Sequence, residues 1–141
     1  MTDDTGKRDE ALSFLVGHTT GVLATIGQEG TPRARLVYYA CDDSFNVYFI
    51  TLANTRKAHD LERNLHAAFV VSETDAPRTL QLEGTVEDLT DKAGIDATLA
   101  SLVETLMSNT KFGAPLTRFD TGELKFYRLT PSWVRWGNFT V

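Results

Sequence analysis

Two basic side chains occupy an unusual position in the stretch FITLANTRKAHDLERN, residues 49–64. A strand-like run is followed by a turn, and the pattern then predicts a helix with Arg56 and Lys57 in its first turn. A helix N-terminus already carries partial positive charge from its unpaired N–H groups, so acidic side chains are favoured there. A bound anion would resolve this conflict.

Hydroxyl groups flank the two cations. Thr51 ends the predicted strand, and Asn54 or Thr55 can cap the helix and leave its backbone amides directed outward. Hydroxyls, amides, a guanidinium and an ammonium in one corner would form a cradle for a phosphate. Taken alone, the stretch favours a simpler interpretation, in which both cations are solvated and Arg56 forms one surface ion pair with Asp60.

A third cation, Arg35, lies in a predicted strand on the same face as Val37 and Tyr39. A buried guanidinium needs an anionic partner, because an unpaired one is very costly. The alternative is an edge-strand arginine that extends to water. If this strand pairs with the next one, residues 45–52, Arg35 and Lys57 meet, and one phosphate between them would satisfy both.

Two tryptophans occur in the C-terminal stretch LTPSWVRW. Trp133 and Trp136 are three residues apart in a predicted strand, so they point to opposite faces. One can belong to the core while the other lies near a cofactor or a partner surface, although packing in the core or an interface explains both equally simply.

Other reactive side chains form no recognisable motif. His59, Glu62 and His66 lack the spacing of metal ligands, and no cysteine or carboxylate cluster completes a site. Cys41 has no histidine nearby in the sequence that would activate it as a nucleophile. The sequence contains neither a glycine-rich dinucleotide fingerprint nor a P-loop. It therefore predicts no metal site, and it leaves the catalytic residues unknown.

The composition is that of one ordinary globular domain. The 141 residues are 42% hydrophobic, and the net charge of −5 argues against a nucleic-acid surface. A single cysteine cannot form an internal disulfide, which favours a reducing cytoplasm. No apolar run approaches the roughly 20 residues of a membrane helix, and the polar start lacks a signal-peptide core. We expect a cytoplasmic single domain over residues 1–141, with 1–8 as a flexible tail.

Hydrophobic periodicity predicts a mainly β chain with inserted helices. Leu80, Leu82 and Val86 alternate with polar residues in the clearest strand pattern. The helical stripe near the N-terminus consists of Ala11, Leu12, Leu15 and Val16. The predicted strands are 21–27, 33–40, 45–52, 67–72, 79–89, 123–129 and 132–139, and the predicted helices are 8–17, one starting near Arg56 and one following Asp91. Six or seven strands with three helices indicate a small antiparallel β-barrel with peripheral helices.

These motifs also occur in a particular order. GVLAT is followed by an R-x-V strand (Arg35, Val37), YFIT, TRK, a strand ending in E-G, and L-x-P-x-x-x-x-W. Over about residues 10–136 this order resembles the pyridoxamine 5′-phosphate oxidase-like superfamily of FMN-binding split barrels. The resemblance implies a six- to seven-stranded antiparallel split barrel. It also implies a homodimer with FMN bound at the two-fold interface.

The resemblance further implies which residues contact the flavin. The FMN phosphate would be held by Arg35, Thr51, Thr55, Arg56 and Lys57. The neighbours of the ribityl chain and ring would be Leu36, Val37, Tyr38 and Ile50, with Trp136 packed near the flavin. A glutamine of the family approaches the ring at the position of Thr79, while Gln81 lies two residues further along on the same face, so either of them can occupy this place.

Two departures concern the substrate. Pyridoxamine-phosphate oxidases carry a lysine near the end of the R-x-V strand, where this chain has Ala40. They also continue past the tryptophan into a segment whose arginine and histidine grip the substrate phosphate, whereas this sequence ends at Val141. We therefore do not expect vitamin B6 oxidase activity.

The function expected from the resemblance is that of an FMN-dependent oxidoreductase, with hydride transfer between the flavin and a small substrate. Alternatives are a non-catalytic FMN-binding protein for electron transfer or flavin storage, and a deazaflavin-dependent relative. Haem is less favoured, because His18, His59 and His66 lie in helical or junction segments. A β-barrel scaffold without a cofactor is the last alternative.

Overall fold

The computed structural model describes residues 2–75, 77–90 and 124–139. Its helices are α1 (Thr2–Val16) and α2 (Arg56–Arg63), and a short 3-10 turn spans Gln28–Gly30. Its strands are β1 (Thr20–Ile26), β2 (Pro32–Tyr38), β3 (Ala40–Cys41), β4 (Val47–Leu52), β5 (His66–Glu73), β6 (Arg78–Asp88) and β7 (Leu124–Asn138). Within these ranges, no helix combines the length and the hydrophobicity needed to cross a membrane.

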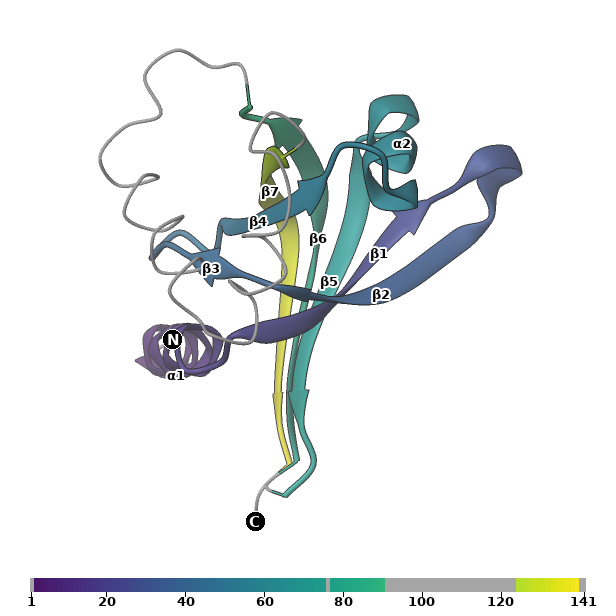
Figure 1. Cartoon of the computed structure of the whole chain (residues 1–141). Helices are drawn as coiled ribbons and strands as arrows, with labels where there is room; N and C mark the ends of the chain where they lie inside the picture. Colours follow the sequence, from purple (N-terminus) through teal and green to yellow (C-terminus); the bar gives the residue numbers. More distant parts are fainter. Residues whose placement is uncertain (1, 76, 91–123, 140–141) are drawn as a thin grey trace.

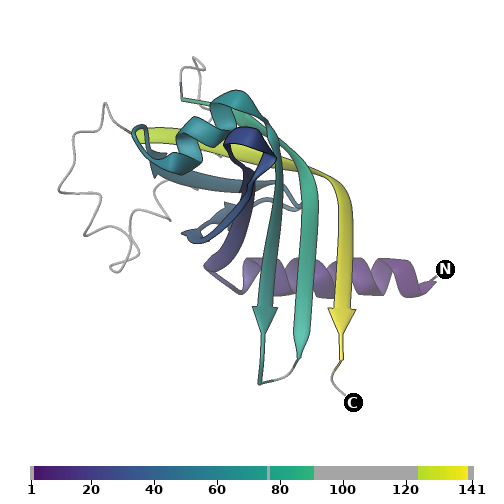
Figure 2. The ribbon, with the colours of Figure 1, turned by 90° about the vertical axis from the view of Figure 1, so that its right-hand side faces the viewer.

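The strands form one antiparallel sheet in the order β2-β1-β5-β6-β7-β4-β3. The sheet curls into a half-barrel, with β5, β6 and β7 as its long central strands (Figures 1 and 2). Helix α1 crosses one end of these strands, and α2 lies beside the turn that joins β1 to β2 (Figures 1 and 2). The predicted mainly β fold, an antiparallel split barrel, is confirmed.

The predicted pairing of the second strand (33–40) with the third (45–52) is confirmed only at Ala40, which pairs with Tyr48, and is wrong for the rest of the second strand. β2 pairs with β1, whereas β4 pairs with β7 and with the two-residue β3. Consecutive strands often pair with each other, but after β2 this chain passes to the opposite end of the strand order, where it forms β3 and β4. Here only Ala40 and Cys41 continue into the tight turn that precedes β4. β2 and β4 still make contact, because the curl of the sheet brings its two sides together.

The two predicted C-terminal strands are one continuous strand. β7 pairs with β6 along the whole length of β6. The register shifts by a β-bulge between Glu83 and Gly84, opposite Pro131, and the strand continues past it. Pro131 lies beyond the last pair between β7 and β4, Val47 with Leu129, so its missing N–H removes no bond on that side. Gly84 is required here, because a Cβ on it would lie 2.0 Å from the carbonyl oxygen of Thr130.

The core lies inside the curl and under α1. Leu80, Leu82 and Val86 are buried, as their alternation predicted. In α1 the buried residues are Ala11, Phe14 and Leu15. Val16 is 63% exposed, so the predicted stripe is rotated toward Phe14.

Helix α1 begins at Thr2, within the range 1–8 that the sequence predicted as a tail. This part is polar and carries no apolar stripe, so periodicity did not extend the helix to it. The helix predicted after Asp91 lies outside the described residues.

Candidate functional site

Of the two caps that the sequence allowed for α2, Asn54 and Thr55, the structure uses Thr55. The Thr55 hydroxyl accepts a hydrogen bond from the amide of Ala58 at 3.4 Å. The hydroxyl of Thr51, at the end of β4, lies 3.0 Å from that of Thr55. These contacts join the end of β4 to the start of α2, and they place Arg56 and Lys57 in the first turn of the helix, directly after the β4–α2 turn.

A buried carboxylate ties α2 to the β1–β2 hairpin. Asp60 is 3% exposed. It accepts hydrogen bonds from the Thr25 hydroxyl at 2.9 Å and from Nη1 of Arg33 at 3.2 Å. Nη2 of Arg35 lies 3.6 Å from the same carboxylate, and Nη1 of Arg35 donates to Thr25 at 2.7 Å. Two partly buried guanidiniums and a buried carboxylate thus satisfy one another.

The surface ion pair between Arg56 and Asp60 is not formed, because α2 turns Asp60 toward the sheet. The importance of Asp60 and Arg33 is missed by sequence reasoning. A usable signal existed: Arg33 and Arg35 alternate onto one face of a strand, and one acid on the following helix stood next to the apolar Leu61.

Lys57 has no such partner. It is half-buried, and no hydrogen bond or ion pair engages it in the part of the chain that the structure describes. Burial lowers the pKa of its ammonium group, and the positive charge of Arg35 lowers it further. Burial also lowers the pKa of Arg35, while Asp60 acts in the opposite direction. The positive charges of Lys57 and its neighbouring arginines therefore exceed the negative charge that Asp60 supplies.

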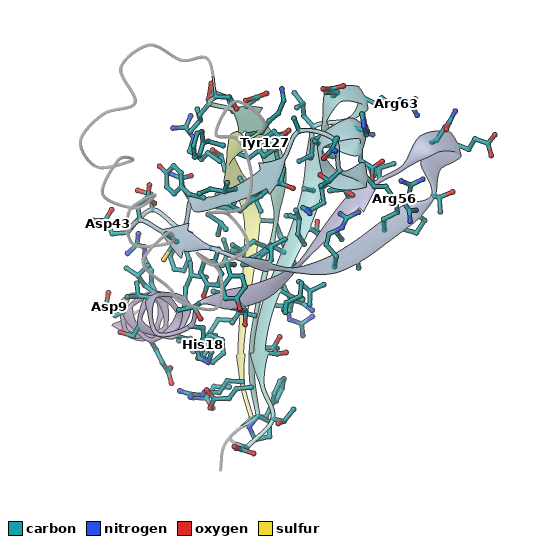
Figure 3. All side chains as sticks on the ribbon, in the orientation of Figure 1. Asp9, His18, Asp43, Arg56, Arg63 and Tyr127 are labelled. Carbon is teal, nitrogen blue, oxygen red and sulfur yellow. The ribbon has the colours of Figure 1, made fainter. Side chains whose placement is uncertain are left out.

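Arg33, Arg35, Arg56 and Lys57, which we call the cation corner, surround an open pocket of about 550 Å³. The lining residues are Arg33, Ala34, Arg35, Thr55, Arg56 and Lys57, with no acidic side chain among them. In Figure 3, Arg56 lies between α2 and the turn end of the β1–β2 hairpin. The structure thus brings together four residues predicted to hold a phosphate, Arg35, Thr55, Arg56 and Lys57, and adds Arg33.

The other residues predicted near the phosphate and ribityl chain lie on β2 and β4. Val37, Ile50 and Thr51 are almost fully buried, so only their backbone or a small edge could meet a ligand. Leu36 is 64% exposed on the outer face of β2, and Tyr38 on the same face is half-buried. None of these five residues lines the pocket at the cation corner.

A second pocket of about 330 Å³, which we call the outer-face pocket, crosses the outer side of the sheet. Its lining residues are Val22, Ala24, Ala34, Ala68, Phe69, Val70, Gln81, Leu82, Glu83 and Trp133. Gln81 belongs to it and Thr79 does not. Ala34 lines both pockets, so they meet at β2.

The two tryptophans point to opposite faces, as predicted. Trp133 is 43% exposed and lines the outer-face pocket. Trp136 packs on the core, with its ring centroid 5.0 Å from that of Phe14, and its Nε1 donates to Glu10 at 3.3 Å. In this single chain, Trp136 therefore belongs to the contact between α1 and β7.

Cys41 is not an activated nucleophile. Burial, with a smaller effect of Asp42, raises the pKa of its thiol to about 11, so the group is protonated at neutral pH. Within the described ranges, no three His, Cys, Asp or Glu side chains gather as metal ligands.

Comparison with known families bears directly on these motifs. The family model described as pyridoxamine 5′-phosphate oxidase matches residues 8–136. The chain belongs to this family. The pyridoxine/pyridoxamine 5′-phosphate oxidase of Cupriavidus metallidurans is 38% identical over 94 residues, 66% of this chain and 44% of the relative. That of Salinibacter ruber is 42% identical over 67 residues, 48% of this chain and 31% of the relative. The chain thus spans less than half the length of these curated relatives.

Solved structures share the fold at lower identity. A FAD-binding protein from Mesorhizobium loti superposes with a TM-score of 0.73 at 20% identity, covering 89% of this chain and 87% of that protein. A heme-binding protein from Mycobacterium smegmatis also gives 0.73 at 20% identity, covering 93% of this chain and 53% of that protein. The predicted family resemblance and its fold are confirmed.

The electrostatic tension at Lys57 leads to a stability prediction. A lysine whose pKa is lower in the folded than in the unfolded protein destabilises the fold at pH 7. This cost begins to fall as pH rises past the folded pKa, and it is gone only above the unfolded pKa. In ligand-free protein, Lys57→Met should raise the free energy of unfolding at pH 7 by on the order of 0.5 kcal/mol, since water still reaches the site. Urea unfolding between pH 7 and 10 would measure this gain and its decline with pH.

Lys7→Met, on the exposed surface of α1, is the matched control and should change little. A Lys57→Met variant that is less stable than the wild type at pH 7 would show that the ammonium group is well compensated in the fold.

Proposed function

We propose that the protein is an FMN-binding flavoprotein that holds the flavin phosphate at the cation corner, and that it acts as a flavin-dependent oxidoreductase on a small substrate. One observation carries this proposal: four cations converge at the capped start of α2 around a pocket without an acidic lining residue. Such a corner is costly in a free protein and favourable around a phosphate.

The charges match a phosphate dianion. Asp60 offsets one of the four cations, and three positive charges remain for about two negative ones. The outward amides at the start of α2 add hydrogen-bond donors. An anion beside Lys57 would also oppose the lowering of its pKa. In a chain with a net charge of −5, this local excess of positive charge needs such an explanation.

The rest of the cofactor extends from the cation corner along β2. Leu36, Tyr38 and the backbone at Val37 and Ile50 border the ribityl chain and ring, as the family resemblance implies. Thr51 supports the phosphate site through its contact with Thr55. Gln81, which lines the outer-face pocket, is a better neighbour of the ring than Thr79. The family resemblance also places Trp136, which packs between α1 and β7 in its own chain, near the flavin.

The protein's role is to bind and orient, because flavin supplies the hydride chemistry when it is bound. The pocket at the cation corner has no carboxylate, cysteine or histidine among its described lining residues. Protons would therefore exchange with solvent. Without turnover, the same arrangement would serve as a flavin store or an electron-transfer partner.

A second copy of the chain completes the site. The outer face of the sheet exposes Val22, Leu36 and Trp133 next to Ala24 and Ala68, which form an apolar surface across neighbouring strands. An apolar surface of this kind favours burial against a partner. Because Ala34 joins this surface to the cation corner, a homodimer formed here would cover the bound flavin from the outer side.

Phosphate recognition predicts a difference between FMN and riboflavin. Arg35→Ala and Lys57→Ala should each weaken FMN binding by about 1.5–3 kcal/mol, the scale of a charge-assisted hydrogen bond. Riboflavin, which lacks the phosphate, should bind almost equally to all variants. Quenching of flavin fluorescence during titration measures both ligands, and Lys7→Ala is the control for loss of a lysine elsewhere.

Wild-type protein that is colourless when purified and gains no thermal stability from FMN would overturn the proposal. A ligand at 100 times its Kd should add roughly 2.7 kcal/mol. Equal affinity for FMN and riboflavin would remove the phosphate from the cation corner.

The dimer predicts sensitivity at the centre of the outer face. Ala68 pairs with Ala24 of β1 and with Glu83 of β6, at the centre of the proposed dimer interface. Ala68→Arg would place a long charged side chain in that interface. We expect this variant to be monomeric by sedimentation velocity and to bind FMN more weakly. Ser13→Arg, on the exposed side of α1, should remain dimeric. A monomeric wild type would refute the dimer.

Oxidoreductase activity predicts reduction of the bound flavin. Under anaerobic conditions, the FMN-loaded protein should lose its visible absorption on titration with NADH or NADPH, because hydride transfer reduces the flavin. Free FMN at the same concentration is the control for reaction in solution. An unchanged spectrum with both nicotinamides, and reduction by dithionite, would favour the non-catalytic flavoprotein.

A further inference from the structure

The side chain of Arg33 is confined on two sides. Its Nη1 donates to Oδ1 of Asp60 at 3.2 Å. On the other side it lies across Gly27, where an added Cβ would be 2.4 Å from Nε and 2.7 Å from Cζ of Arg33. The backbone φ of Gly27 is −82°, which other residues adopt easily, so the space above it and not its conformation is what the glycine provides. The absence of a side chain at Gly27 thus leaves the space that the guanidinium of Arg33 occupies.

Holding Arg33 in this position costs folding free energy. Nε of Arg33 is buried and has no hydrogen-bond partner in the described chain. Its charge also stands near those of Arg35 and Arg56 at the same pocket. Buried unsatisfied donors and like charges both destabilise a fold. The Nε atoms of Arg78 and Arg128 share the first feature, so the like charges around the pocket are what a bound anion would relieve at Arg33.

Asp60 divides its two oxygens between the arginines. Oδ1 faces Arg33, and Oδ2 faces both Thr25 and Arg35. The two arginines are two residues apart on β2 and therefore emerge on one face of the strand. Without the carboxylate, their mutual repulsion would favour separate, solvated positions. With it, both guanidiniums stay at the wall of the pocket.

We propose that Arg33 is a further phosphate-binding residue and that Asp60 is the positioning residue that holds it, together with Arg35, at the cation corner. This proposal rests on the proposed binding of FMN. A purely electrostatic role for Asp60 has the opposite consequence, because removing a negative charge near the pocket would then tighten the binding of a phosphate.

The test compares FMN with riboflavin in the full chain, by titration of flavin fluorescence. The measured quantity is the ratio of the riboflavin Kd to the FMN Kd, which isolates the contribution of the phosphate. Arg33→Ala and Asp60→Asn should each lower this ratio about tenfold. The double variant should lower it by less than the product of the two single effects, because both changes remove the Arg33 contact and only Asp60→Asn also releases Arg35. Glu62→Gln, an exposed acid on α2, should leave the ratio unchanged.

A second variant separates positioning from charge. Gly27→Ala changes no charge, but its methyl group would displace the guanidinium of Arg33. It should lower the ratio as Arg33→Ala does, and it keeps the test decisive if Asp60→Asn does not fold.

The outcomes distinguish the two proposals. A wild-type ratio near one would refute phosphate binding itself. A wild type that prefers FMN, together with an unchanged ratio in Arg33→Ala and Gly27→Ala, would overturn the role of Arg33. A raised ratio in Asp60→Asn would overturn the positioning role of Asp60 and support simple repulsion.

Discussion

The buried carboxylate of Asp60 is the interaction on which the rest of the site depends. A charge that is 3% exposed is tolerated only with partners, and its partners are the Thr25 hydroxyl and two guanidiniums from β2. These contacts fix α2 against the β1–β2 hairpin. Since Lys57 and Arg56 start that helix, the same contacts also determine where they lie relative to Arg33 and Arg35.

The curl of the sheet supplies the second constraint. β2 lies at one end of the strand order and β4 lies next to the other end, so a flat sheet would keep them far apart. Curling brings them into contact, and the chain leaving β4 can then place α2 beside β2. The pocket is lined by β2 on one side and by the capped start of α2 on the other, and residues on such regular elements are positioned more precisely than residues on loops.

The cation corner is a place where stability and binding oppose one another. Lys57 is half-buried and lacks a partner among the described residues, and Arg33 retains a buried, unsatisfied N–H. Both features weaken the ligand-free fold, and an anion in the pocket would compensate the charge of Lys57. The outer-face pocket adds an apolar surface that meets this corner at Ala34. A ligand with an anionic end and a large flat ring would match the two surfaces together.

The sequence by itself determined the features that depend on neighbouring residues. The alternation of Leu80, Leu82 and Val86, the Thr55 cap and the cations at the helix start follow from local hydrogen bonding and periodicity. The order of such motifs was also enough to indicate the family. Only the tertiary structure decided that β2 pairs away from β4, that β7 continues through Pro131 and that Asp60 is buried beneath Arg33. The physical reason is that strand order and the burial of a charge depend on partners far away in the chain, which local patterns do not specify.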